Sequence, residues 1–418
     1  MRTEFFISIS ITLISTALWG REIPAVIFNI SADSSEYVLL VDKRLQKLYV
    51  AESNAPQEIN LVKEFRITTG KVAGDKEREG DRRTPEGIYY IEGVIPSNKL
   101  TKKYGPAAYI LDYPNFVDRL QGRNGSNIWI HGRDEAIRDR ITEGCISLDN
   151  NQLLTLGSYL KIKQTPVIIY DNLDGYLVTN KQDYQKNWST WQDYLNSWVQ
   201  AWQQGALDQY VDYYAPTFRD EGGRSKPHFR AYKASLEERY AWKRVNLEKI
   251  LLLTSRQETH VRFIQKYQSP YFYSEGLKKL ILIPTESGWK IVSETFSPTR
   301  RRLSTEEFIE NFLQKWEKAW ETKDIESYCA CYAPSFRSDG MDFQTWRKYK
   351  NEIFTSLGQI NIERNNLKVQ SPQALTYTVA FRQIYQADGY RDVGLKTLVI
   401  QGTPDSLRIV REEWKKLE

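Results

Sequence analysis

The chain has 418 residues, which at roughly 150 residues per domain allows two to three domains. Hydrophobic residues make up 41% and charged residues 27%, ordinary values that exclude a polytopic membrane protein and a mostly disordered chain. The net charge of +5 is too weak over this length to indicate a nucleic-acid partner.

An uncharged, apolar run from Phe5 to Leu18 follows the basic start Met1-Arg2. The run is shorter than the roughly 20 residues that a membrane-spanning helix needs, and small residues follow it. We therefore predict a signal sequence over residues 1–20 that directs export to the periplasm or cell envelope. An uncleaved anchor and a buried N-terminal element are the alternatives, because Trp19-Gly20-Arg21 is not a clean cleavage site.

Short β-type runs separated by Gly, Pro and Asn fill residues 36–171. One helix is expected after Asp149, ending at Gly157. The pattern predicts a mainly-β domain. The predicted strands are Tyr37–Asp42, Lys47–Val50, Leu61–Thr69, Ile88–Ile91, Ala108–Leu111, Ile128–Ile130 and Pro166–Tyr170.

A polar linker, Asp171 to Gln185, leads into two copies of one sequence. The segment Trp198–Trp202 recurs as Trp316–Trp320, and Tyr214–Arg219 recurs as Tyr332–Arg337. One constant offset relates both pairs and holds over most of each copy. Such a register indicates an internal duplication whose units are too long for a solenoid, so each copy is predicted to be a domain.

Each copy begins with a long amphipathic helix and continues with alternating strands, an α+β order. This order resembles the cone-shaped NTF2-like fold, here in tandem copies at residues 186–297 and 303–418. The resemblance implies binding or positioning modules for a glycan, a protein partner or self-association. Cys329 and Cys331 lie in a helical apolar pattern and are predicted to be core residues.

Residues with catalytic potential are concentrated between Ile128 and Asn150. His131 stands at the end of an apolar strand, and Cys145 follows a glycine further along the segment. An imidazole beside a thiol can form a nucleophile, whereas a buried cysteine and a satisfied histidine are the structural alternative. No Cys/His spacing, including that of His228 and His260, indicates a zinc site, so we expect no metal or other cofactor.

The pattern His131-Gly132 followed by Thr142-Glu143-Gly144-Cys145 resembles the signature of the YkuD-type L,D-transpeptidase domain. Leu39–Lys43, Ile67–Lys71 and Thr84–Gly87 resemble further motifs of that domain. The resemblance spans residues 36–171, about a third of the chain.

The resemblance implies that Cys145 is the nucleophile, that His131 is its base and that the carbonyl of Gly132 orients the imidazole. The N–H groups of Gly144 and Cys145 would form the oxyanion hole. The implied substrate is a peptidoglycan stem tetrapeptide, whose terminal D-Ala is expelled as a thioester forms. That thioester passes to an amine in an L,D-transpeptidase, or to water in an L,D-carboxypeptidase. A thiol with a lowered pKa is expected.

Two positions depart from the family pattern, and both are expected to line the substrate pocket with Thr142. Glu143 stands where the family often has His, and Ser147 where it often has Arg or Asn. We expect basic residues of the preceding loop to supply the missing positive charge, with a solvated loop as the alternative. These are Arg133, Arg138 and Arg140.

A YkuD-type domain followed by NTF2-like domains also resembles the Cds6-like cell-shape group, whose members can act as L,D-carboxypeptidases. The sequence therefore predicts an exported cysteine enzyme of wall remodelling and cell shape. A wall-binding scaffold with a degenerate catalytic domain and a hydrolase that detaches wall-linked protein are the alternatives.

Overall fold

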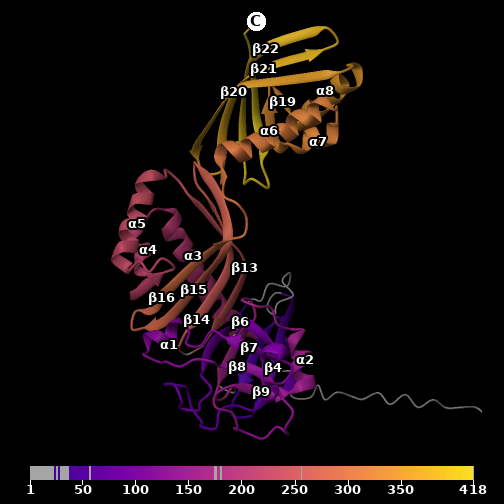
Figure 1. The fold of residues 1–418 in the computed structure, drawn as a ribbon. Helices are drawn as coiled ribbons and strands as arrows, with labels where there is room; N and C mark the ends of the chain where they lie inside the picture. The colour runs from indigo at the N-terminus through magenta and orange to yellow at the C-terminus, as the bar shows by residue number, and fades with distance from the viewer. Residues whose placement is uncertain are drawn as a thin grey trace, which may run out of the picture. The chain divides into compact units, whose positions relative to one another are not determined.

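The structure is a computed structural model that describes residues 23–24, 27–28, 37–55, 58–173, 177–178, 181–255 and 257–417 (Figure 1). The predicted signal sequence lies outside these residues. Among the residues described, no helix has the length and apolar character needed to cross a membrane. The chain forms two compact units. The first is Met1–Tyr194 with Lys249–Val261 and Ile281–Gly288, and the second is Leu195–Glu248, Arg262–Leu280 and Trp289–Glu418.

An eight-stranded sheet forms the N-terminal domain, with strand order β5-β4-β3-β10-β6-β7-β8-β9. Its strands are β3 (Val38–Asp42), β4 (Lys47–Ala55), β5 (Glu58–Arg66), β6 (Gly87–Pro96), β7 (Ala107–Leu111), β8 (Trp129–Arg133), β9 (Ile146–Asp149) and β10 (Pro166–Tyr170). Short helices connect them. These are η2 (Ser97–Lys99), η3 (Lys102–Tyr104), α1 (Phe116–Leu120) and α2 (Asn150–Gly157). The predicted mainly-β domain is confirmed, although α1 and β9 were not predicted.

The central strands are apolar on both faces because both faces of the sheet are covered. Leu39 and Val41 of β3 point to the face covered by α2. Val38 and Leu40 point to the opposite face, as successive residues of a strand must. Helix α2 begins where the sequence predicts, because the Asp149 side chain accepts hydrogen bonds from the first free N–H groups of the helix.

Two α+β domains follow, and the predicted pair of NTF2-like cones is confirmed. The first contains α3 (Lys181–Gln203), α4 (Leu207–Asp212), β12 (Tyr214–Asp220), α5 (Lys226–Arg239), β13 (Arg244–Thr254), β14 (Thr259–Gln268), β15 (Phe272–Thr285) and β16 (Gly288–Pro298). The second contains α6 (Thr305–Glu321), α7 (Ile325–Ala330), β18 (Tyr332–Ser338), β19 (Met341–Asp342), α8 (Phe343–Ser356), β20 (Ile360–Gln373), β21 (Thr376–Ala387), β22 (Tyr390–Gln401) and β23 (Arg408–Lys416). Helices α6, α7 and α8 cover one face of the second sheet (Figure 1).

Four short strands complete the topology. Strands β1 (Ile23–Pro24) and β11 (Leu177–Val178) pair as a separate two-stranded sheet, and the other two extend the sheet of the first α+β domain. Strand β2 (Ile27–Phe28) pairs with β13, and β17 (Leu303–Ser304) pairs with β15. The predicted linker, Asp171 to Gln185, is too long. Helix α3 already begins at Lys181, because its amphipathic pattern extends back to the buried Tyr184.

The duplicated aromatic residues build the cores. Trp198 and Trp316 are fully buried, and each donates its indole N–H to a buried tyrosine of its own copy, Tyr214 at 3.3 Å and Tyr332 at 3.0 Å. Cys329 and Cys331 are free thiols in the core of the second copy, which confirms their predicted role in packing.

Candidate functional site

Two neighbouring strands bring His131 and Cys145 to the same place. Strands β8 and β9 run parallel, with Ile130 opposite Ile146 and His131 opposite Ser147. Cys145 directly precedes β9 and therefore lies beside the start of β8. Its thiol donates to the carbonyl of Asn127 at 3.4 Å.

The imidazole of His131 is held in one orientation. Its Nδ1 lies 2.8 Å from the carbonyl oxygen of Gly132, and a carbonyl can only accept, so Nδ1 carries the proton. The Nε2 of the neutral ring therefore keeps a lone pair. Burial lowers the pKa of His131, as do the positive charges of Arg133 and Lys103. The ring is thus a neutral base at ordinary pH.

The thiol of Cys145 is half-buried, and this burial raises its pKa. The expectation of a lowered thiol pKa is therefore wrong. The cations Lys103 and Lys76 act in the opposite direction, but their effect is smaller than that of desolvation. A neutral thiol and a neutral imidazole on neighbouring segments are the resting state that follows.

Gly144 shapes the turn before the cysteine. It has a φ of +129°, and a Cβ at this position would lie 2.9 Å from the carbonyl oxygen of Arg83. Its N–H donates to Thr142 Oγ1 at 3.2 Å, while Thr142 Oγ1 donates to the carbonyl of Cys145 at 2.6 Å. The N–H of Cys145 donates to no acceptor among the described residues, whereas that of Gly144 must first leave Thr142 to bind an oxyanion.

The residues predicted to bind substrate are not all gathered around the thiol. Glu143 is exposed and ion-paired with Lys71 and with Arg82, the latter at 3.1 Å, and the Lys71 hydrogen bond lowers its pKa. Ser147 is fully buried, with its Oγ 3.5 Å from His131 Nδ1, so it packs behind the imidazole.

The three loop arginines do not share a common partner. Arg133 pairs with Glu135 at 2.5 Å, and Arg140 lies 3.7 Å from Asp171. Arg138 is exposed and makes no ion pair within the described part of the chain. Their predicted role in substrate binding stays a prediction.

Two contacts of the site were missed by sequence reasoning. Tyr104 packs edge-on against both Trp129 and His131, with ring centroids 5.2 and 4.9 Å apart. Thr84 is buried and donates to the carbonyl of Gly144 at 2.9 Å. The Tyr104-Gly105-Pro106 turn was the available signal for the first contact. The Thr84-Pro85 turn was noted, but only as a motif.

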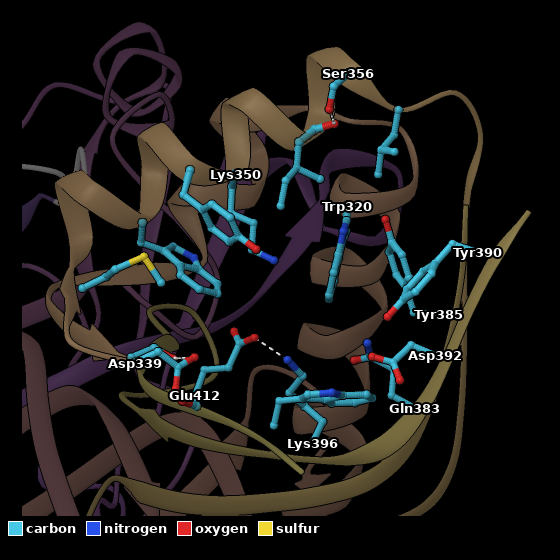
Figure 2. Close-up of a pocket in the computed structure, with 17 residues that line it drawn as sticks. Trp320, Asp339, Lys350, Ser356, Gln383, Tyr385, Tyr390, Asp392, Lys396 and Glu412 are labelled. Carbon is cyan, nitrogen blue, oxygen red and sulfur yellow. Dashed lines mark hydrogen bonds and ion pairs between the residues drawn. The ribbon is translucent and has the colours of Figure 1, made fainter. Parts of the chain in front are cut away.

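A cavity of about 440 Å³ lies in the second NTF2-like domain between α8, the end of α6 and the sheet (Figure 2). Lys350 and the ion pair Lys396–Glu412 face it, and Lys350 lies 4.5 Å from the ring centroids of both Trp320 and Trp346. Burial lowers the pKa of Lys350 to about 8. Four of the lining groups are buried polar atoms without a hydrogen-bond partner among the described residues, one of them Asp392 Oδ1. The other three are neutral groups. They are Trp320 Nε1, Trp346 Nε1 and Gln383 Oε1.

The first copy repeats the inner part of this cavity but not its entrance. Lys233 lies 4.3 Å from the ring of Trp202, and Lys278 pairs with Glu294 at 2.9 Å. At the entrance, however, Tyr240 and Phe272 pack against each other with ring centroids 5.7 Å apart.

Their counterparts in the second copy leave that entrance open. Leu357 directly follows α8 as Tyr240 follows α5 and takes its place, and Tyr390 takes the place of Phe272. Tyr390 is 57% exposed, so its ring lies at the rim of the cavity.

Family comparisons agree with this division of the chain. The model of the L,D-transpeptidase catalytic domain, YkuD, matches residues 36–169. The model of the Cds6 C-terminal NTF2-like domain matches twice, at residues 190–295 and 308–413.

Individual relatives match parts of the chain. YafK of Escherichia coli K12 is 29% identical over 111 residues, which is 26% of this chain and 40% of that relative. The structure of Bd1075 from Bdellovibrio bacteriovorus is 27% identical with a TM-score of 0.60, over 67% of this chain and 99% of that one. A mutant of Pgp2, the helical cell shape determining protein of Campylobacter jejuni, is 25% identical with a TM-score of 0.52, over 66% and 94%.

These matches cover the segment that holds His131 and Cys145 as well as both duplicated domains. The model of the Cds6 C-terminal NTF2-like domain accounts for half of the chain, so the chain belongs to that family, and a domain that matches the L,D-transpeptidase catalytic domain, YkuD, precedes the two copies.

Proposed function

We propose that this protein is an exported cysteine acyl-transferase of the cell wall that cleaves the bond before the terminal D-Ala of peptidoglycan stem tetrapeptides. The observation that carries the proposal is the His131–Gly132 hydrogen bond, which leaves Nε2 as the base on the strand adjacent to Cys145. The YkuD match supports the substrate class, and the resemblance to Pgp2 supports a role in cell shape.

The reaction begins when Nε2 of His131 takes the proton of the Cys145 thiol. The thiolate attacks the carbonyl carbon before D-Ala, and the N–H of Cys145 stabilises the oxyanion that forms. The C–N bond then breaks, the imidazolium returns its proton to the amine of the departing D-Ala, and a thioester remains. Because both partners are neutral at rest, thiolate forms only as the substrate closes over the site and His131 accepts the proton.

The thioester has two fates. An amine from a second stem peptide gives a cross-link, whereas water gives a tripeptide. Product analysis by mass spectrometry separates them, using the protein from about residue 21 onward with purified disaccharide-tetrapeptide. Loss of D-Ala alone identifies a carboxypeptidase, and a dimer that has lost one D-Ala identifies a transpeptidase. If neither product forms, or if Cys145→Ala gives the same products, the proposal is wrong.

A second role, ligand binding by the second NTF2-like domain, is supported by the unpartnered Trp320, Trp346 and Gln383 atoms of its cavity. Aromatic rings with buried donors and acceptors suit a glycan or a peptide-bearing sugar. We expect Gln383→Leu to weaken binding of the full chain to purified wall fragments while release of D-Ala from soluble tetrapeptide is unchanged. The matched change in the first copy, Gln265→Leu, should leave binding intact. Equal effects of both changes would contradict a role for the second cavity alone.

A further inference from the structure

The tip of the β13–β14 hairpin of the first NTF2-like domain, Lys249–Val261, is part of the compact unit that contains the catalytic domain. Leu251 and Leu253 of β13 are buried in one core with Val38, Leu40 and Ile88 of the catalytic sheet. These leucines therefore cover the sheet face opposite α2.

A buried carboxylate stands at the end of this hairpin. Glu258 is 3% exposed, and its Oε1 accepts a hydrogen bond from the N–H of Ile88 at 2.7 Å. Its Oε2 lies 3.0 Å from His260 Nε2 and 3.5 Å from Asn115 Nδ2. Three donors thus surround the carboxylate, as burial of a charge requires. His260 in turn stacks on Tyr90, with ring centroids 5.8 Å apart.

The catalytic domain leaves room for this carboxylate by having glycine at position 87. A Cβ on Gly87 would lie 2.7 Å from Glu258 Oε1. The hydrogen bond to Ile88 therefore fixes the backbone where the Thr84–Gly87 turn enters β6.

That turn leads directly to the cysteine loop. Thr84 is three residues before Gly87, and its Oγ1 both accepts from the N–H of Gly70 and donates to the carbonyl of Gly144, each at 2.9 Å. The short backbone segment Thr84–Ile88 and one hydrogen bond thus join the backbone that Glu258 holds to Gly144, the residue preceding Cys145.

The duplication provides an internal comparison. In the second copy Thr376 and Thr378 occupy the positions of Glu258 and His260, and Val369-Gln370-Ser371 occupies that of Leu251–Leu253. Val369 and Ser371 are only half-buried, whereas Leu251 and Leu253 are buried. The hairpin thus differs between the copies at the residues that contact the catalytic domain in the first copy.

We propose that the tip of the β13–β14 hairpin, Lys249–Val261, is a structural part of the active site, in which Glu258 is a positioning residue that holds the Thr84–Gly87 turn and, through it, the Gly144–Cys145 loop. The expected effect of Glu258 on activity rests on the proposed function. Its expected effect on the position of the cysteine loop does not. The family match of the first NTF2-like domain does not by itself indicate such a role.

The test compares Glu258→Ala with Thr376→Ala, its matched control in the second copy, in the full chain. Alkylation of each cysteine by iodoacetamide is followed by mass spectrometry. Loosening the loop should hydrate the Cys145 thiol and speed its alkylation about tenfold, while the core residues Cys329 and Cys331 keep their rates. D-Ala release should show a lower kcat with nearly unchanged KM, because a misplaced nucleophile costs rate rather than binding. Thr376→Ala should resemble the parent chain in every respect.

Two further variants test the contact between Glu258 and β6 if Glu258→Ala does not fold. Gly87→Ala places a Cβ against Glu258 Oε1 from the side of the catalytic domain. This variant should also show faster alkylation of Cys145 and a lower kcat. Glu258→Gln retains an acceptor for Ile88 and should recover part of the parent behaviour. If Cys145 alkylation in the folded variants stays within twofold of the parent, or if all three cysteines accelerate together, the inference is overturned. Absence of D-Ala release by the parent chain would instead count against the proposed function, since alkylation needs no substrate.

Discussion

At the scale of single residues, the proposed catalytic pair, His131 and Cys145, is chemically neutral at rest. Burial lowers the pKa of His131 and raises that of Cys145, so both changes disfavour the ion pair that a thiolate and imidazolium would form. The Gly132 carbonyl is the one contact that favours imidazolium. This arrangement gives a definite pH dependence.

Activity should rise with pH through a pKa below 6.5, the ordinary value for histidine, because His131 must be neutral to accept a proton. Lys103 contributes to this lowering, so Lys103→Gln should shift the acid limb of the kcat/KM profile to higher pH. The neighbouring exposed Lys102 provides the control variant, Lys102→Gln, which should leave the limb in place. An acid limb that is the same in both variants would exclude an electrostatic role for Lys103.

Buried ion pairs in the NTF2-like cores make a second prediction at this scale. Glu412 pairs with Lys396, accepts from Tyr332 at 2.8 Å, and has its pKa lowered by Lys396 and Lys350. Glu412→Gln leaves these ammonium groups buried without a counter-charge and should cost about 3 kcal/mol of unfolding free energy at pH 7. Urea unfolding measures this loss, and Glu412→Gln combined with Lys396→Met should recover part of it.

The pH dependence of the same pair has a fixed sign. A carboxyl with a lowered folded-state pKa contributes stability above its ordinary value of 4.5 and loses it as the pH falls through the folded-state pKa. The difference in stability between the parent and Glu412→Gln should therefore shrink in acid. A constant difference down to pH 3 would contradict the ion-pair explanation.

At the scale of elements, the Gly144 turn combines two constraints that can be separated. Gly144→Ala introduces both a positive φ for alanine and a contact of 2.9 Å with the Arg83 carbonyl. Gly74 has a φ of +90° with nothing within 4 Å of its would-be Cβ, so Gly74→Ala carries only the backbone strain.

We expect Gly144→Ala to lower kcat for D-Ala release about a hundredfold, because the clash displaces the cysteine loop. Gly74→Ala should cost about 1 kcal/mol of stability and little activity. Steady-state kinetics and urea unfolding of both variants provide the measurement. Similar losses of activity would assign the effect to backbone strain alone.

The helices, strands and turns also show which features of the fold and the site could be predicted from the sequence. The His131 and Cys145 motif, the α2 boundaries and the duplication are local or periodic signals, and all are visible in the chain. The Glu258 contact with Ile88 joins residues 170 positions apart, so no local pattern contains it. The raised pKa of Cys145 likewise depends on burial by the completed fold. The closed entrance of the first copy depends on Tyr240, whose tertiary role its sequence position does not reveal.

At the scale of the whole molecule, the two NTF2-like copies are joined by shared packing. Tyr273 of β15, in the first copy, is 1% exposed and belongs to the hydrophobic core of the second. Trp242 donates to the carbonyl of Ser371 at 3.1 Å, and Gln268 donates to Tyr377. These contacts lie inside the second compact unit, which spans parts of both copies.

The shared packing predicts that the two copies unfold together. Leu398→Ala removes a fully buried side chain from the second core and should cost about 2–5 kcal/mol. Hydrogen exchange read by mass spectrometry along a urea series should show the same shift in midpoint for peptides from β12 and from β23. Leu417→Ala, at a side chain that is 53% exposed, should shift neither.

If the midpoint of β23 shifts and that of β12 does not, each copy is its own folding unit and Tyr273 only fills a gap between them. If both shift, the duplication has produced one cooperative body from two repeats, and a ligand that stabilises the cavity of the second copy also stabilises the first.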